Sequence, residues 1–275
     1  MTTYIDYGPS PLHQGSRSRT GDQVDRQFVH DLLAVLGDCR LLWLPNLTDT
    51  TTSTERSRHA GTVTWSESLA SFDTRPARLG SGAAVAFNGT DEQGDVPDAG
   101  RYSFGDGATD QPFSIIAVAK INDTAAKRTL LSKYDTTTSA TKREWRFYVE
   151  STDVLTFALY DESTGGSIGM DTDAAIAFGD WALYGATCDG GGSMEGCKVY
   201  IDAARPAQMG ISSGTYAAAE DTASLVRVGS TQGAAAGTDF MNGSMALVAL
   251  TAKELTQDEM WTVKELVSSY FGLSL

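Results

Sequence analysis

The chain of 275 residues has a formal net charge of −14, which argues against nucleic acid and anionic membranes as partners because both repel an acidic surface. A hydrophobic fraction of 41% with only 20% charged residues indicates a folded core rather than a disordered chain. No stretch approaches the ~20 apolar residues of a membrane span, and residues 1–15 lack the apolar segment of a secretory signal peptide.

The first 21 residues have no periodic pattern of apolar side chains and are predicted to form an extended arm. They include Tyr4 and Tyr7 and a short basic segment that contains Arg17 and Arg19. A polar terminal segment of this kind becomes ordered only when a surface holds it, either on its own domain or on a neighbouring subunit. We predict that the arm attaches the protein to a partner through these four side chains.

Residues 22–37 have the spacing of an amphipathic helix. Phe28 and Leu32 fall on one face, and Gly37 suits the position after the last turn. Such a helix either packs on the domain or docks on a partner. We include Phe28 among the predicted partner contacts.

Short segments with alternating or continuous apolar residues recur along the rest of the chain, separated by turn signals. The predicted strands are residues 41–45, 62–65, 113–121, 143–150, 154–161, 181–188, 198–202, 225–229 and 245–251. The run from Phe113 to Ile121 is almost entirely apolar, which predicts burial on both faces or a helix or partner over its outer side. This series of strands predicts an all-β domain.

Residues 181–188 and 198–202 flank a loop with four glycines and are predicted to form the central hairpin of an antiparallel sheet. Cys188 and Cys197 border this loop and could face each other across it. Three cysteines do not make a disulfide framework, so free thiols are the favoured state.

The last predicted helix, residues 256–271, has clear terminal signals. Thr256 and Glu259 match a capping box, and Gly272 can end the helix. Its apolar residues share one face, which predicts packing against the domain.

The segments of the hairpin also form a recognisable series. Asp180-Trp181, Ala186-Thr187, Asp189-Gly190 and Lys198–Asp202 together resemble the laminin-G-like branch of the concanavalin A-like lectin/glucanase superfamily. Other segments that fit this family in order are residues 41–45, 85–91, 113–120, 130–134, 145–149, 225–229 and 240–243.

The resemblance covers roughly residues 40–260. It implies a two-layer antiparallel β-sandwich, the concanavalin A-like jelly roll. We therefore expect the arm and first helix at residues 1–38, followed by the sandwich and the C-terminal helix at residues 39–275.

Glycosidases of this superfamily carry a Glu-x-Asp-x-Glu pattern on one strand, so that two carboxylates flank the sugar bond. No such pattern occurs here, and the acidic cluster at residues 91–95 lacks the alternation of a strand. His13, His30 and His59 accompany no nucleophile motif, and the Cys and His spacing of a zinc site is absent. We predict no catalytic residues, no metal centre and no cofactor.

Calcium is the one ligand that the resemblance implies, because many members of the family bind it near a sheet edge. An acidic pair would be expected shortly after residues 240–243, where this chain has Met245 and Ala246. Asp189 and Asp202 remain candidate ligands, although the capping of turns is the favoured interpretation of both.

Sugar binding without catalysis would need aromatic side chains on an exposed face. Five aromatic residues lie on predicted strands and are available for such contacts: Trp145, Tyr148, Tyr160, Tyr184 and Tyr200. Of these, Trp145, Tyr148 and Tyr160 are the candidate carbohydrate contacts. The alternative is that they belong to the core, as most aromatic residues of strands do.

Three functions follow from the resemblance. We favour a non-enzymatic structural or decoration protein of a bacteriophage particle, associated with capsid or tail, because stand-alone laminin-G-like proteins with an N-terminal arm resemble such components. Its partner would be the major capsid protein or another virion protein, a homotrimer would suit a local threefold axis, and it would reside in the virion after synthesis in the host cytoplasm. The alternatives are a carbohydrate-binding module that adheres to a surface glycan, and a glycan-active enzyme with an atypical site.

Overall fold

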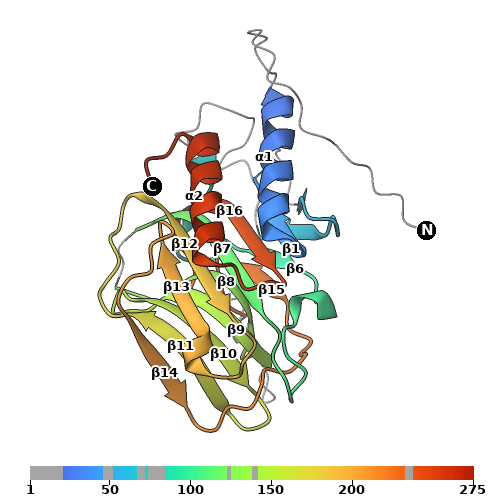
Figure 1. The fold of residues 1–275 in the computed structure, drawn as a ribbon, viewed down its shortest axis with the longest axis vertical. Coiled ribbons are helices and arrows are strands. Elements are labelled where there is room, and N and C mark those ends of the chain that lie inside the picture. Colours follow the sequence, from blue (N-terminus) through green and yellow to red (C-terminus); the bar gives the residue numbers. More distant parts are fainter. Residues whose placement is uncertain are drawn as a thin grey trace, which may run out of the picture.

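The computed structural model is a sandwich of two antiparallel sheets, with two helices on the outer face of one of them (Figure 1). This arrangement confirms the predicted all-β jelly roll with flanking helices. In the described part of the chain, neither helix is long and apolar enough to cross a membrane. The structure describes residues 21–45, 52–66, 72–73, 84–122, 125–137, 142–232 and 238–275.

The first sheet has the strand order β13-β12-β7-β16-β5-β4, with β1 beside β16. Its strands are β1 (Cys39–Trp43), β4 (Phe72–Asp73), β5 (Ala84–Asn88), β7 (Phe113–Ile121), β12 (Trp181–Cys188), β13 (Cys197–Ile201) and β16 (Asn242–Thr251). The predicted hairpin of β12 and β13 is confirmed, but its predicted central place is wrong, because β13 lies at the edge of the sheet. Strand order depends on long-range pairing, which the pattern within a hairpin does not encode.

The second sheet has the order β14-β11-β10-β9-β8-β15-β6-β3-β2. Its strands are β2 (Thr52–Thr54), β3 (Thr62–Trp65), β6 (Gly94–Val96), β8 (Arg128–Asp135), β9 (Lys142–Val149), β10 (Leu155–Asp161), β11 (Gly166–Thr172), β14 (Gln208–Ser213) and β15 (Val226–Val228). Short 3-10 turns, η1 (Gly100–Tyr102) and η2 (Met194–Gly196), occur in the connections. The predicted hairpin of β9 and β10 is confirmed, with Phe147 paired to Phe157.

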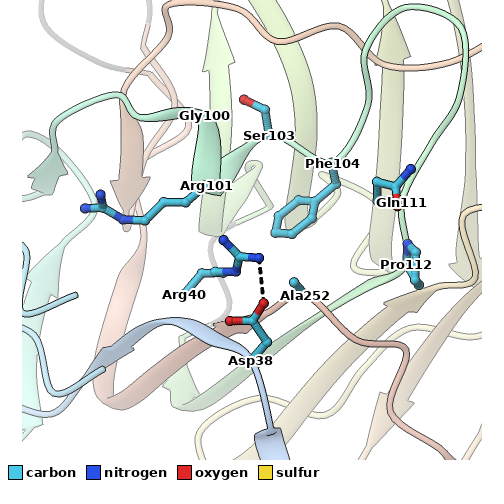
Figure 2. A pocket seen from close by; sticks show the side chains of 9 residues that line it. All are labelled: Asp38, Arg40, Gly100, Arg101, Ser103, Phe104, Gln111, Pro112 and Ala252. Atoms are coloured by element: carbon cyan, nitrogen blue, oxygen red, sulfur yellow. Dashed lines mark hydrogen bonds and ion pairs between the residues drawn. The ribbon is translucent and has the colours of Figure 1, made fainter. Parts of the chain in front are cut away.

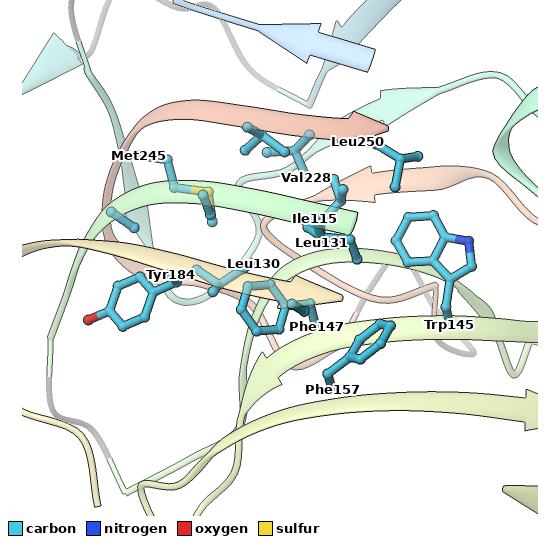
Figure 3. Close-up of a cluster of buried hydrophobic side chains, with 14 of the residues drawn as sticks. Ile115, Leu130, Leu131, Trp145, Phe147, Phe157, Tyr184, Val228, Met245 and Leu250 are labelled. Atoms are coloured by element: carbon cyan, nitrogen blue, oxygen red, sulfur yellow. The ribbon is translucent and has the colours of Figure 1, made fainter. Parts of the chain in front are cut away.

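The space between the sheets is filled by large side chains that point inward from alternate strand positions (Figure 3). Phe113 of β7 meets Phe157 of β10 edge to face, with ring centroids 5.5 Å apart. Trp145 of β9 is fully buried, and its indole nitrogen donates to the carbonyl oxygen of Tyr102 at 2.9 Å. The aromatic residues of β9 and β10 therefore belong largely to the core.

A second hydrophobic layer lies between the first sheet and the helices α1 (Gly21–Leu36) and α2 (Gln257–Phe271). Phe28 of α1 stacks on Tyr270 of α2, with ring centroids 3.9 Å apart and planes inclined by 7°. The capping box of α2 is confirmed, because the Thr256 side chain accepts from the Glu259 backbone N–H and the Glu259 side chain accepts in return. β7 is thus buried on both faces, as its apolar run predicts.

Candidate functional site

Of the predicted carbohydrate contacts, Trp145 is ruled out by its position. Its side chain points between the sheets with 0% exposure, so the prediction that it touches a sugar is wrong. The same alternation that places Phe147 inside places Trp145 inside, because the two are separated by one residue on β9.

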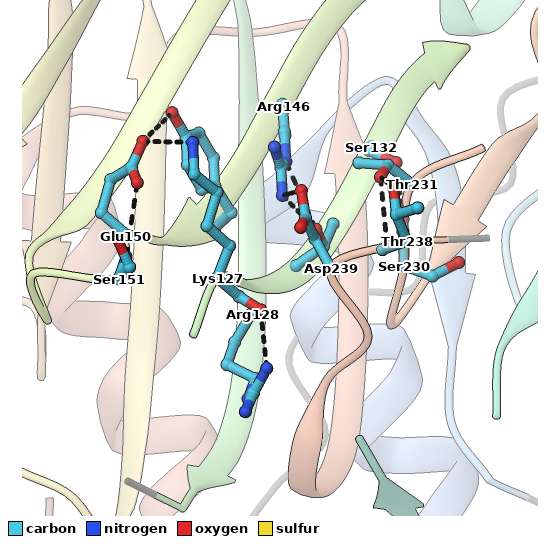
Figure 4. Close-up of polar contacts among 12 residues, drawn as sticks. Lys127, Arg128, Ser132, Arg146, Glu150, Ser151, Ser230, Thr231, Thr238 and Asp239 are labelled. Carbon is cyan, nitrogen blue, oxygen red and sulfur yellow. Dashed lines mark hydrogen bonds and ion pairs between the residues drawn. The ribbon is translucent and has the colours of Figure 1, made fainter. Parts of the chain in front are cut away.

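Tyr148 lies on the opposite face of β9 but is only 5% exposed. The guanidinium of Arg146 lies over its ring, 4.0 Å from the centroid, and its hydroxyl donates to Glu150 at 3.0 Å. Lys127 forms an ion pair with the same Glu150 carboxylate at 2.9 Å (Figure 4). Tyr148 is therefore also removed from the set of accessible sugar contacts, since other side chains already cover it.

Tyr160 is half-buried and meets Tyr134 edge to face at 5.0 Å. Arg146 donates to Thr129 at 2.8 Å and to Asp239 at 2.7 Å. These hydrogen bonds hold its guanidinium group in place beside the tyrosine rings (Figure 4). Burial raises the pKa of the Tyr160 hydroxyl. This outer patch of the second sheet has its charged groups engaged internally, and we assign it to stabilising the sheet.

The predicted partner contacts Tyr4, Tyr7, Arg17 and Arg19 lie outside the described residues. Phe28 lies within them, and its prediction as a partner contact is wrong. It is 5% exposed because the apolar face of α1 packs on α2. Attachment through the arm, a virion partner and a trimer therefore stay predictions.

Of the two aspartates named as candidate calcium ligands, Asp189 caps its own turn, because it accepts from the N–H of Gly191 at 2.7 Å. Asp202 accepts from the N–H of Leu183 on the paired strand β12 at 2.9 Å, so it makes a contact across the hairpin and is not a turn cap. Among the described residues, no three His, Cys, Asp or Glu side chains gather in a way that could hold a metal ion.

A cavity of about 470 Å³ lies where β12 begins and β13 ends. The segment before β12, the end of the hairpin and the residues after α2 surround it, and Figure 1 shows the C-terminal residues beside β12. The lining side chains used below are Ile176, Asp180, Trp181, Tyr184, Asp202, Leu273 and Ser274. We call this cavity the Trp181 pocket.

Antiparallel pairing explains how these side chains meet. The first residues of β12 and the last of β13 are neighbours, with Tyr184 opposite Ile201, so Asp202 follows directly beside them. Trp181 packs partly against the helix layer, whereas Tyr184 points into the space between the sheets. The pocket therefore joins the two sides of the first sheet at its end.

Tyr184 brings a hydroxyl to the inner side of the pocket. Its side chain is 1% exposed, and its hydroxyl forms no hydrogen bond with the residues that the structure describes. Figure 3 shows that hydroxyl directed away from the other labelled core side chains. Burial, and next the charge of Asp202, raises the pKa of Tyr184, so the hydroxyl stays protonated and can donate.

The pocket also has carboxylate groups, and a lysine ammonium lies near its aromatic ring. Asp180 is exposed, and within the described chain it forms neither a hydrogen bond nor an ion pair. Trp181 is half-buried, and the ammonium of Lys120 lies 5.9 Å from its ring centroid. An aromatic ring, two carboxylates, the hydroxyls of Tyr184 and Ser274 and apolar walls suit a ligand that has both an apolar face and hydroxyl groups.

A second cavity of about 250 Å³ lies near β1 and η1 (Figure 2). Arg40 enters it but is paired with Asp38 at 2.6 Å, and Phe104 stacks on Phe113 with ring centroids 4.2 Å apart. Arg101 donates to the hydroxyl of Tyr102 at 2.9 Å. This cavity is the smaller of the two and its charged groups are engaged, so the Trp181 pocket is the better candidate.

Sequence reasoning missed Trp181, Asp180 and Asp202 as members of one site. The signal was present, because Asp180-Trp181 opens one strand of a hairpin and Asp202 closes the other. Any antiparallel hairpin brings these two ends together. The contribution of Leu273 had no such signal, since it depends on where α2 docks.

Comparison with known proteins agrees with this fold. The sequence profile described as the Concanavalin A-like lectin/glucanases superfamily matches residues 88–260. The chain belongs to this superfamily. No curated protein matches it.

Solved structures share the superfamily fold at low sequence identity. The ligand-binding domain of botulinum neurotoxin serotype D, in complex with N-acetylneuraminic acid, has a TM-score of 0.56 and 12% identity over 86% of this chain and 52% of its own. The binding domain of Paraclostridial mosquitocidal protein 1 has a TM-score of 0.57 and 12% identity over 84% of this chain and 52% of its own.

A sialidase of Trypanosoma rangeli in complex with sialic acid has a TM-score of 0.56 and 12% identity over 92% of this chain and 39% of its own. The chain thus spans about half the length of the two binding domains and less of the sialidase. At this identity the likeness establishes the shared fold alone.

Proposed function

We propose that this chain is a non-catalytic carbohydrate-binding domain and that the Trp181 pocket is its binding site. The observation that carries the proposal is Tyr184, whose side chain is 1% exposed, lines the pocket and forms no hydrogen bond within the described chain. Its hydroxyl oxygen is not fully buried, so the pocket gives access to it. A ligand hydroxyl in the pocket can therefore take the place of water as its hydrogen-bond partner.

Each wall of the pocket has a role in this proposal. The ring of Trp181 would pack on the apolar C–H face of a pyranose, while Asp180 and Asp202 accept hydrogen bonds from its hydroxyls. The cavity of about 470 Å³ falls within the roughly 300–1,000 Å³ typical of small-molecule sites. There is room for a sugar residue and part of the next.

Membership of a lectin-containing superfamily supports sugar binding, and two structural neighbours are described with a bound sialic acid. Binding without catalysis is supported by the environment of the carboxylates. A glycosidase needs one carboxyl in apolar surroundings to act as an acid. Asp180 is exposed, and Asp202 accepts a hydrogen bond from the backbone N–H of Leu183.

A glycan array followed by calorimetric titration of each hit tests the proposal. Trp181→Ala should weaken binding at least tenfold, and Tyr184→Phe, which removes one hydroxyl, should weaken it by about three- to tenfold. The matched control is Trp261→Ala on α2, because this tryptophan is 43% exposed and is not part of the pocket wall.

Thermal melting of each variant separates lost binding from lost folding. A hit that binds the Trp181→Ala protein as tightly as the wild type contradicts the proposed site. An array without any saturable hit at millimolar sugar contradicts carbohydrate binding itself.

A further inference from the structure

The charged side chains that line the Trp181 pocket have one sign. They are Asp180 and Asp202, both acidic, and neither forms an ion pair within the described residues. Lys120 approaches the ring of Trp181 at 5.9 Å but does not line the cavity. The formal net charge of −14 adds a background of the same sign.

The two carboxylates also supply hydrogen-bond acceptors to the pocket. Asp180 offers two acceptor oxygens, and Asp202 offers its second oxygen, because the first accepts from Leu183. The donor side chains that line the pocket are the hydroxyls of Tyr184 and Ser274 and the indole N–H of Trp181. At the acidic side of the pocket, a ligand must donate hydrogen bonds in order to engage the oxygens of Asp180 and Asp202.

We propose that the Trp181 pocket selects uncharged or amine-bearing sugars and discriminates against sugars with an acid group. This inference rests on the proposed function and names its ligand class. A hydroxyl or ammonium group can donate to both carboxylates, whereas a carboxylate or sulfate can only accept and is repelled by them. Sialic acid, described with two of the structural neighbours, belongs to the disfavoured class.

The size of the discrimination follows from Coulomb's law. At a separation of about 6 Å in water-like surroundings, each carboxylate weakens the binding of an anion roughly threefold, and a less polar pocket increases the effect. Two carboxylates therefore give roughly tenfold discrimination between a neutral sugar and the acid of the same shape. Salt screens these interactions over about 8–10 Å, so the discrimination shrinks as ionic strength rises.

The test is a titration of the full chain with two matched series, glucose, glucosamine and glucuronate, and galactose, galactosamine and galacturonate. In the series that binds, we expect the amino sugar to bind at least as tightly as the neutral sugar and the acid to bind about tenfold more weakly. The Asp180→Asn variant, which changes an exposed side chain, should reduce that factor to about three. Methyl glucuronate and methyl galacturonate, which keep the shape without the charge, should bind like the neutral sugars.

The outcomes separate the two proposals. An acid that binds as tightly as its neutral counterpart, or a ratio that does not respond to Asp180→Asn, overturns the charge selection and leaves carbohydrate binding standing. Failure of all the sugars to bind contradicts the proposed function.

Discussion

Lys133 of β8 is a fully buried cation, and its removal gives a sharp test of how the second sheet is held. Its ammonium contacts Glu144 at 2.5 Å, Asp98 at 2.9 Å and the carbonyl oxygen of Thr222 at 2.5 Å. Glu144 is also 0% exposed and accepts from the N–H and the hydroxyl of Thr222. The cluster therefore ties β8 and β9 to the segment before β15.

Lys133→Met keeps most of the side-chain volume but leaves the buried Glu144 carboxylate without its cation. Removal of one member of a buried ion pair costs about 3–5 kcal/mol of unfolding free energy. Burial raises the pKa of Glu144 to about 7, against the opposing effect of Lys133. Without Lys133 this pKa must rise further.

The sign of the pH dependence follows from that shift. A carboxyl whose pKa is higher in the folded chain stabilises the fold in its protonated form, fully below the ordinary value of 4.5, and loses this contribution as the pH rises through the folded value. The cost of Lys133→Met should therefore be about 3–5 kcal/mol at pH 8 and below about 2 kcal/mol at pH 5, where Glu144 binds a proton.

Urea unfolding at both pH values, followed by tryptophan fluorescence, measures these costs. The control is Lys127→Met, because the pair of Lys127 with Glu150 is partly exposed and should contribute less than about 1 kcal/mol. A Lys133→Met cost under 1 kcal/mol at pH 8, or an equal cost at both pH values, would refute the reasoning.

Two further predictions concern the helix layer and the thiols. Phe28→Ala should lower the unfolding free energy by about 3–5 kcal/mol, because it removes a buried ring that stacks on Tyr270, and a loss below 1 kcal/mol in urea unfolding would show that α1 is not part of the core. Burial raises the pKa of Cys39 to about 12, and the hydrogen bond with Cys188, followed by burial, raises the pKa of Cys197, so a thiol reagent at pH 8 should modify the chain only in denaturant. Mass spectrometry counts the adducts, and full labelling of the native protein would contradict this expectation.

The parts of the fold that the sequence predicts well are those governed by neighbouring residues. The capping box at Thr256 and Glu259 is complete within four residues, and the apolar run from Phe113 to Ile121 coincides with β7. Cys188 and Cys197 lie opposite each other, as the hairpin requires, and are free. In each case the local pattern and the final packing agree.

Burial of charge on the second sheet could not be predicted in this way. Arg146 occupies a position that alternation assigns to solvent, yet it is 3% exposed. Lys133 is opposite Trp145, on the same face of the sheet as the core residue Leu131, and it is 0% exposed despite its charge. The register between β8 and β9 shifts beside Lys133, and the segment with Asp239 covers Arg146. Both effects come from irregular pairing and long-range loops, which no local period records.

The Trp181 pocket could be predicted from the sequence only in part. Its hairpin side follows from local pairing, but Leu273 reaches it only because α2 docks against α1 and the first sheet. The stacked pair of Phe28 and Tyr270 holds that docking, so one wall of the site depends on a contact made near the start of the chain. The first helix, for which the sequence allows both packing on the domain and docking on a partner, thus supports the pocket from a distance. A sheet edge alone would leave Trp181 without an opposing apolar wall.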